Sequence, residues 1–134
     1  MRKKRILVVD DQAIYREPIT MTLNANGYHA IGAKDGSSAI KELEKSVTPF
    51  NLILLDYSMS EMNGLEFLEK IRKNADWEGI PVIMLTEMAD KNLVIKAGAL
   101  GVDTYILKST FSLEHLLKEI DNLVEGDIVN ISNM

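Results

Sequence analysis

Three short runs of unbroken apolar residues constrain the fold of this 134-residue chain more than any other feature. They are residues 6–9 (ILVV), 52–55 (LILL) and 82–85 (VIML). A strand with one face in water alternates apolar and polar residues, whereas a strand covered on both faces is apolar throughout. The runs therefore predict parallel strands buried inside a sheet, and weaker patterns at 29–32 and 105–107 predict two more.

The segments between these runs carry the apolar spacing of amphipathic helices. The spacing i, i+3, i+4, i+7 is clearest after Ser112, and related patterns follow Asp35 and Gly64. We expect Asp35 and Ser112 to cap their helices, a short helix to begin at Asp90, and a further helix to follow the first strand. Five strands that alternate with five helices predict an α/β fold, a doubly wound parallel sheet with helices on both faces.

Composition and charge exclude several classes of protein. A hydrophobic content of 46% over this length suits one domain with a full core. The chain has no cysteine, so it can form neither disulfides nor a thiolate zinc site. No apolar stretch approaches the ~20 residues of a membrane span, so we expect a cytoplasmic protein with no membrane contact. A net charge of −5 indicates that this domain does not bind nucleic acid directly.

Polar residues follow the predicted strands at the points where the strands end. Asp10 and Asp11 follow the first strand, Asp56 ends the third, Thr86 ends the fourth and Lys108 follows the fifth. All lie at carboxyl ends of parallel strands, the edge where open α/β sheets bind ligands. Each alone has an ordinary explanation, such as a helix cap or a solvated charge. Their joint placement predicts a functional site.

The residue types at this edge favour phosphoryl chemistry. Carboxylates brought close together repel one another unless a cation lies between them. Oxygen ligands without cysteine or histidine favour a hard ion, so we expect magnesium (Mg²⁺). Lys108 and the Thr86 hydroxyl would supply a positive charge and a hydrogen bond to an incoming phosphoryl group. A carboxylate can itself be the nucleophile and form an aspartyl phosphate.

The same residues stand in motifs that resemble one family. Residues 8–11 (VVDD), 54–56 (LLD) followed by 62–64 (MNG), 85–86 (LT) and 98–108 (GALGVDTYILK) are similar to the receiver domain of two-component response regulators, a family that includes chemotaxis regulators. The resemblance covers the chain from about residue 4 to 124. It implies a flavodoxin-like (βα)5 fold with strand order 2-1-3-4-5. We expect a receiver domain over 1–124. Over 125–134 the helical pattern is lost, and we expect a C-terminal tail or the beginning of a linker.

The resemblance implies a role for each residue of the predicted site. Asp56 accepts a phosphoryl group from a sensor histidine kinase or a histidine phosphotransfer protein, and Thr86 and Lys108 contact the phosphate. The implied Mg²⁺ ligands are Asp10, Asp11, Asp56 and the backbone carbonyl of Ser58. The protein would be a signalling receiver, not an enzyme that acts on a separate metabolite.

The resemblance also implies a switch. Tyr105 changes rotamer as Thr86 moves toward the phosphate, and the surface of the fourth helix, fifth strand and fifth helix is altered. That surface would act on a downstream target protein or on a fused output domain.

Four residues depart from the family pattern. Ser60 and Ser109 stand where the family usually has proline, Glu87 stands where it prefers a small residue, and Pro18 is tolerable only in the first turn of its helix. The family's Lys–Pro bond is typically cis, and a cis bond between Lys108 and Ser109 would cost about 2.5–4 kcal/mol. These departures leave open a phosphorylation-independent interaction module of the same fold.

Two other classes share part of the pattern. Residues 56–60 (DYSMS) spell D-x-S-x-S, the metal-adhesion motif of von Willebrand A-type domains. Those domains place the motif after their first strand and give no role to Asp10, Asp11 or Lys108. A flavin-binding flavodoxin needs hydroxyls and amides after its first strand, where this chain has two aspartates. Both classes are therefore disfavoured.

Overall fold

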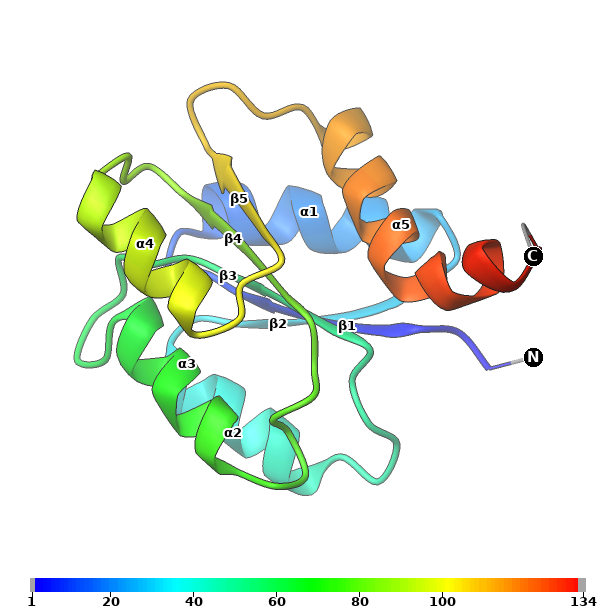
Figure 1. The fold of residues 1–134 in the computed structure, drawn as a ribbon, viewed down its shortest axis with the longest axis horizontal. Helices are drawn as coiled ribbons and strands as arrows, with labels where there is room; N and C mark the ends of the chain where they lie inside the picture. The colour runs from blue at the N-terminus through cyan, green and yellow to red at the C-terminus, as the bar shows by residue number, and fades with distance from the viewer. Residues whose placement is uncertain (1, 133–134) are drawn as a thin grey trace.

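A computed structural model of the chain describes residues 2–132, with side chains as far as residue 125. Five parallel strands form one sheet in the order β2-β1-β3-β4-β5 (Figure 1). The strands are β1 (Arg5–Val9), β2 (His29–Ala33), β3 (Leu52–Leu55), β4 (Val82–Thr86) and β5 (Thr104–Leu107). The helices are α1 (Ala13–Ala25), α2 (Gly36–Lys45), α3 (Gly64–Lys73), α4 (Lys91–Ala99) and α5 (Leu113–Ser132). The predicted fold class and strand order are confirmed.

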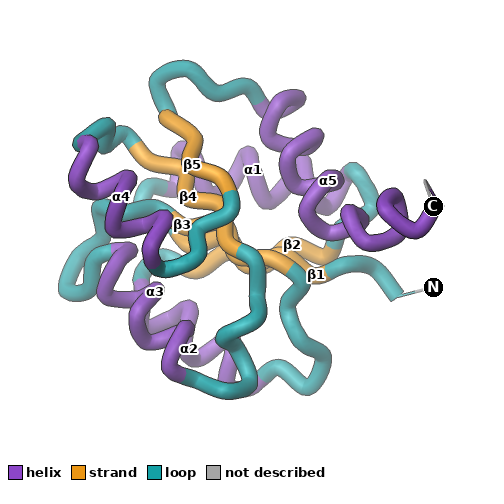
Figure 2. Tube along the Cα trace, viewed as in Figure 1, coloured by secondary structure: helices purple, strands orange, loops and turns teal. Residues whose placement is uncertain are grey.

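The helices cover both faces of the sheet. α1 and α5 lie on one face, and α2, α3 and α4 lie on the other (Figures 1 and 2). In β1, Leu7 and Val9 belong to the core under α2 and α3, whereas Ile6 and Val8 belong to the core under α1 and α5. Because successive side chains of a strand point to opposite faces, both kinds of position are buried. This explains the unbroken apolar runs of the sequence.

Side-chain caps fix where several helices begin. The Asp35 carboxylate accepts a hydrogen bond from the Ser38 backbone N–H at 2.7 Å, and this bond lowers the pKa of Asp35. Asp90 caps α4 in the same way, by accepting from the backbone of the first turn. The Ser112 hydroxyl accepts from the His115 N–H at 3.1 Å at the start of α5. The capping roles predicted for Asp35 and Ser112 are therefore confirmed, as is the short helix predicted to begin at Asp90.

Pro18 lies deeper in its helix than expected. It is the sixth residue of α1, beyond the first turn. Its ring removes the N–H that would bond to the carbonyl of Ile14. The Ile14 side chain is 77% exposed and Pro18 is also exposed, so this face of α1 lies in water. Water can therefore solvate the carbonyl that has lost its donor.

The last helix is longer than the sequence analysis predicted. α5 continues to Ser132, so the predicted loss of helix from residue 125 is wrong. The apolar spacing through Ile120, Val124, Ile128 and Ile131 continues the helical stripe past the weak helix formers between them. Residues 133–134 of the predicted tail lie outside the described residues, and the assignment of 125–134 as a tail or linker stays a prediction. No helix in the described range is long and apolar enough to cross a membrane.

Gly64 makes a close backbone contact that determines where β3 ends. Its N–H donates to the Tyr57 carbonyl at 2.7 Å. A Cβ at this position would lie 2.5 Å from the Asp56 carbonyl oxygen and 2.8 Å from the Tyr57 Cα. The first turn of α3 can approach the end of β3 this closely only because residue 64 has no side chain.

Replacing Gly64 with alanine should therefore destabilise the fold and displace the end of β3. We expect Gly64→Ala to lower the free energy of unfolding by about 1–3 kcal/mol, the usual effect of overpacking. Urea denaturation measures it. Gly98→Ala in α4 is the control, because a Cβ there meets nothing within 4 Å. The control should gain about 0.5–1 kcal/mol from helix propensity. Equal stability of Gly64→Ala and the native chain would contradict the steric argument.

Candidate functional site

The register of the sheet brings the predicted site residues to one edge. Val9 pairs with Leu55, and the Asp56 N–H donates to the Val9 carbonyl at 3.0 Å. Asp10 and Asp56 therefore follow neighbouring strands at the same height in the sheet. In the described part of the chain, four polar or charged residues are buried. They are Asp10, Asp56, Thr86 and Lys108. Burial of polar groups is thus concentrated where the sequence predicted a site.

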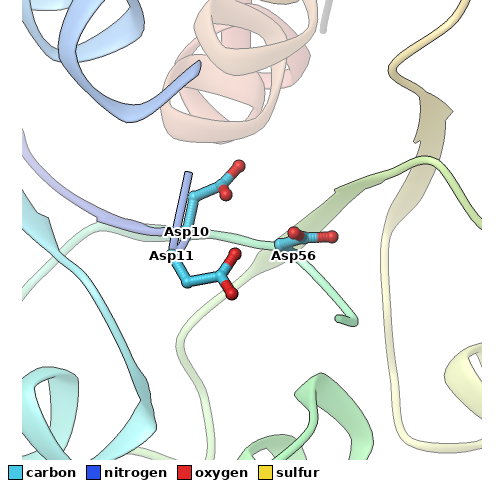
Figure 3. A group of neighbouring side chains, drawn as sticks. All are labelled: Asp10, Asp11 and Asp56. Carbon is cyan, nitrogen blue, oxygen red and sulfur yellow. The ribbon is translucent and has the colours of Figure 1, made fainter. Parts of the chain in front are cut away.

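Three carboxylates form a cluster at this edge. Asp10 and Asp11 at the end of β1 and Asp56 at the end of β3 each offer an oxygen, and these oxygens lie within 4.8 Å of one another (Figure 3). Asp10 and Asp56 are buried and Asp11 is exposed. Mg²⁺ prefers oxygen ligands and usually keeps several of its waters in proteins. A cluster of carboxylates with one exposed member, Asp11, suits both preferences. The residues present therefore fit a magnesium ion.

Ser58 lies beside this cluster. Its backbone N–H donates to the Asp56 Oδ1 at 3.4 Å. The loop after β3 therefore passes close to the Asp56 carboxylate, as the predicted role of the Ser58 carbonyl requires. That role itself stays a prediction.

Lys108 joins two of the carboxylates. Its Nζ lies 2.7 Å from the Asp10 Oδ2 and 3.1 Å from the Asp56 Oδ2, and its side chain is 1% exposed. Its backbone N–H donates to the Thr86 carbonyl at 2.8 Å, which fixes the end of β5 against β4. The described peptide bonds are all trans, including the bond from Lys108 to Ser109. The ammonium thus reaches the carboxylates without the family's cis bond.

The charges at this site are unequal. Burial raises the pKa of Asp10, with a further rise from the Asp56 charge, and the hydrogen bond from Lys108 only partly opposes it. Burial alone would lower the pKa of Lys108, but the hydrogen bond to Asp10 and the charges of both aspartates outweigh it and raise that pKa. Lys108 therefore stays an ammonium. One buried cation faces two buried carboxylates, so the site still favours a further positive charge.

Thr86 and Tyr105, the two predicted switch residues, meet at Met88. Thr86 is fully buried, and its Oγ1 accepts a hydrogen bond from the Met88 N–H at 3.3 Å. The Tyr105 hydroxyl donates to the Met88 carbonyl at 2.7 Å. Partial burial, together with the charges of Asp56 and Asp90, raises the pKa of Tyr105, so its hydroxyl remains a donor. The loop after β4 therefore connects the two side chains.

The departures from the family pattern lie around the site and do not fill it. Glu87 is exposed, although Thr86 before it is buried. Glu61, which follows Ser60, adopts a φ of 68°, and the Met62 N–H donates to the Ser60 carbonyl at 2.8 Å. This is a tight γ-turn, a strained conformation for a residue other than glycine. The loop that carries Ser60 is thus closed by local backbone bonding.

Tyr15 is a further residue of this site and was not predicted from the sequence. The Lys108 Nζ lies over the face of the Tyr15 ring, 4.2 Å from its centroid. The Phe111 ring lies 6.1 Å from the Tyr15 ring, centroid to centroid. The available signal was an aromatic residue one helical turn after the Asp10-Asp11 pair, with a second one shortly after Lys108.

Comparison with known proteins agrees with this arrangement. Residues 6–121 match the model of a family described as the response regulator receiver domain. The chain belongs to this family. Receiver domains are signalling modules of two-component systems, for which phosphorylation and Mg²⁺ binding are typical.

Several known proteins are similar to this receiver domain in sequence. Chemotaxis protein CheY1 of Helicobacter pylori is 36% identical over 105 residues, which is 78% of this chain and 84% of the relative. The phosphate regulon regulator PhoB of Klebsiella pneumoniae is 35% identical over 117 residues, which is 87% of this chain and 50% of the relative. The chain thus spans about half the length of such transcriptional regulators.

Solved structures share the same fold. A CheY-like receiver domain protein of Methanospirillum hungatei matches with a TM-score of 0.86 and 29% identity, over 96% of this chain and 99% of that one. Chemotaxis protein CheY4 of Vibrio cholerae matches with a TM-score of 0.83 and 29% identity, over 91% of this chain and 99% of that one. Both likenesses support the flavodoxin-like receiver fold.

Proposed function

We propose that this receiver domain takes part in a phosphorelay by accepting a phosphoryl group on Asp56. The donor is a sensor histidine kinase or a histidine phosphotransfer protein. The observation that supports this most is the Lys108 ammonium, which lies 3.1 Å from a buried Asp56 carboxylate that also belongs to an acidic cluster. The proposal therefore assigns Asp56 as the nucleophile, Lys108 as the cation beside it, and the carboxylates of the cluster as the oxygens that would bind the metal.

In the proposed reaction, an Asp56 oxygen attacks the phosphorus of a phosphohistidine. A P–O bond forms as the P–N bond breaks, and the electron pair returns to the imidazole nitrogen. The Lys108 ammonium and the Thr86 hydroxyl donate hydrogen bonds to the phosphoryl oxygens. Asp10, Asp11, Asp56 and the Ser58 carbonyl would hold Mg²⁺, which would supply charge neutralisation for the phosphoryl group. The residues of the chain provide position and charge, which is most of what phosphoryl transfer requires.

The proposed switch follows from the contacts of Met88. Phosphorylation adds about 1.5–2 negative charges and three strong acceptors. If the Thr86 hydroxyl turns toward them, its contact with the Met88 N–H is lost, and the loop that holds the Tyr105 hydroxyl is released. A change from 1% to 99% of the active state requires about 5.5 kcal/mol of differential stabilisation. Charge-assisted bonds from Lys108 and Thr86 contribute to this.

The surface of α4, β5 and α5 is the proposed output of the switch. Val94 and Ile95 on α4 are exposed, and α4 follows the loop that contacts Tyr105. The partner is a downstream target protein or a fused output domain, as the greater length of the regulator relatives supports. The proposal includes a cytoplasmic location and no direct contact of this domain with nucleic acid or membrane.

Phosphoryl acceptance can be tested by intact mass. After incubation with Mg²⁺ and a small acyl-phosphate donor, the native domain should gain one phosphoryl group, because the proposal gives it one acceptor, Asp56. Asp56→Asn, which keeps the shape of the side chain, should gain none. An adduct on the Asn variant would contradict the assignment of the nucleophile. No adduct together with no Mg²⁺ binding would favour a phosphorylation-independent interaction module.

The switch can be tested by the NMR signals of the tyrosine rings. On addition of a phosphoryl mimic, the Tyr105 ring signals should shift. The Tyr105 hydroxyl would lose its hydrogen bond to the Met88 carbonyl, and the ring would move inward. The Trp77 indole, which follows α3 and lies outside the α4–β5–α5 surface, serves as the internal control and should not shift. Equal Tyr105 rotamer populations with and without the mimic would contradict the switch.

A further inference from the structure

The Lys108 ammonium has three contacts of two different kinds. Two are charged, to the Asp10 and Asp56 carboxylates at 2.7 and 3.1 Å. The third is the face of the Tyr15 ring, 4.2 Å from ammonium nitrogen to ring centroid. A cation over an aromatic face is attracted by the ring quadrupole, and more strongly where water is excluded, as it is around this side chain.

The two kinds of contact differ in what happens to them during the proposed reaction. Asp10 and Asp56 are the carboxylates that a magnesium ion would use, and Asp56 is the residue that becomes phosphorylated. Both therefore exchange their bonds to Lys108 for other bonds. The Tyr15 ring binds neither a metal ion nor a phosphoryl group, so it keeps its contact throughout.

The Tyr15 ring packs in turn against a second aromatic ring, that of Phe111. Tyr15 lies on α1, and Phe111 lies in the loop between β5 and α5, with an angle of 47° between the two rings. The Thr110 N–H donates to the Leu107 carbonyl at 3.2 Å, which closes the first turn of that loop. Ser109 gives this loop none of the backbone restriction of a proline. The ring pair connects α1 to the loop and restrains it instead.

We propose that Tyr15 is a positioning residue, whose ring face keeps the Lys108 ammonium at the phosphoryl site while Asp10 and Asp56 change partners. This inference rests on the proposed phosphoryl transfer to Asp56. Phe111 supports the ring. The Tyr15 hydroxyl has no part in the role, because the ammonium contacts the ring face.

A packing role is the competing explanation, since Tyr15 and Phe111 also lie against the core under α1 and α5. Packing alone predicts that Tyr15→Leu lowers stability and leaves the chemistry unchanged. Positioning predicts an effect that depends on the presence of Lys108. The two explanations are separated by a double-mutant cycle.

The cycle compares Tyr15→Leu with Tyr15→Phe, each in the native chain and in Lys108→Ala. The readout is the rate of Asp56 phosphorylation by a small acyl-phosphate donor at saturating Mg²⁺. Tyr15→Leu should slow the native domain about ten-fold, the range of a desolvated cation–π contact. Tyr15→Phe should stay within about two-fold, because it keeps the ring. In the Lys108→Ala background, Tyr15→Leu should cause no further loss.

A second readout needs neither metal nor phosphate. The ε-methylene protons of Lys108 should show an upfield NMR shift from the Tyr15 ring current in the metal-free domain. The shift should persist in Tyr15→Phe and disappear in Tyr15→Leu. If Tyr15→Leu does not fold in a thermal melt, Phe111→Leu takes its place, with a smaller loss of rate expected because the ring remains but loses its support.

Each result has one meaning. A native rate in Tyr15→Leu, or an equal loss with and without Lys108, overturns the positioning role while phosphoryl transfer stands. An equal loss in Tyr15→Phe assigns the effect to the hydroxyl and also overturns it. A native domain that forms no adduct overturns the proposed function and this role with it.

Discussion

One buried ammonium between two buried carboxylates determines the rest of this site. Removing three charges from water costs several kcal/mol per ion unless they are well paired, and apolar residues of similar volume would often be more stable. The contacts of Lys108 with Asp10 and Asp56 offset part of that cost. Two carboxylates share one ammonium, so one negative charge remains in excess. The site is thus stable enough to fold and still favours a further cation.

The strands and the principal site residues could be predicted from the sequence because both follow from burial. A strand covered on both faces must be apolar throughout, so each run ends visibly at the first polar residue, and Asp10 and Asp56 are such residues. The end of α5 could not be predicted in this way, because the weak helix formers Gly126, Asp127 and Asn130 interrupt the helical pattern of the sequence there. Tyr15 was missed because its partner Lys108 is distant in sequence, and within α1 an aromatic residue looks like ordinary packing.

The departures from the family pattern are tolerated because the site depends on strand ends more than on loops. Ser109 and Glu87 are the residues that directly follow Lys108 and Thr86. The hydrogen bond from the Lys108 N–H to the Thr86 carbonyl, at 2.8 Å, is present all the same. Ser60 lies in a loop closed by a γ-turn at Glu61. The sheet register therefore sets how Asp10, Asp56 and the ends of β4 and β5 lie relative to one another.

Lys108 is the counter-ion of Asp10 and Asp56 in this structure, and we propose that it gives them up when a metal ion binds. The most direct measurement is the calorimetric Mg²⁺ affinity of the native domain and of Lys108→Met, with Lys118→Met, an exposed lysine on α5, as the control for net charge. Competition for the same oxygens predicts tighter Mg²⁺ binding in Lys108→Met than in either other protein. Equal or weaker binding in Lys108→Met would contradict the claim, because the ammonium would then not compete for these carboxylates.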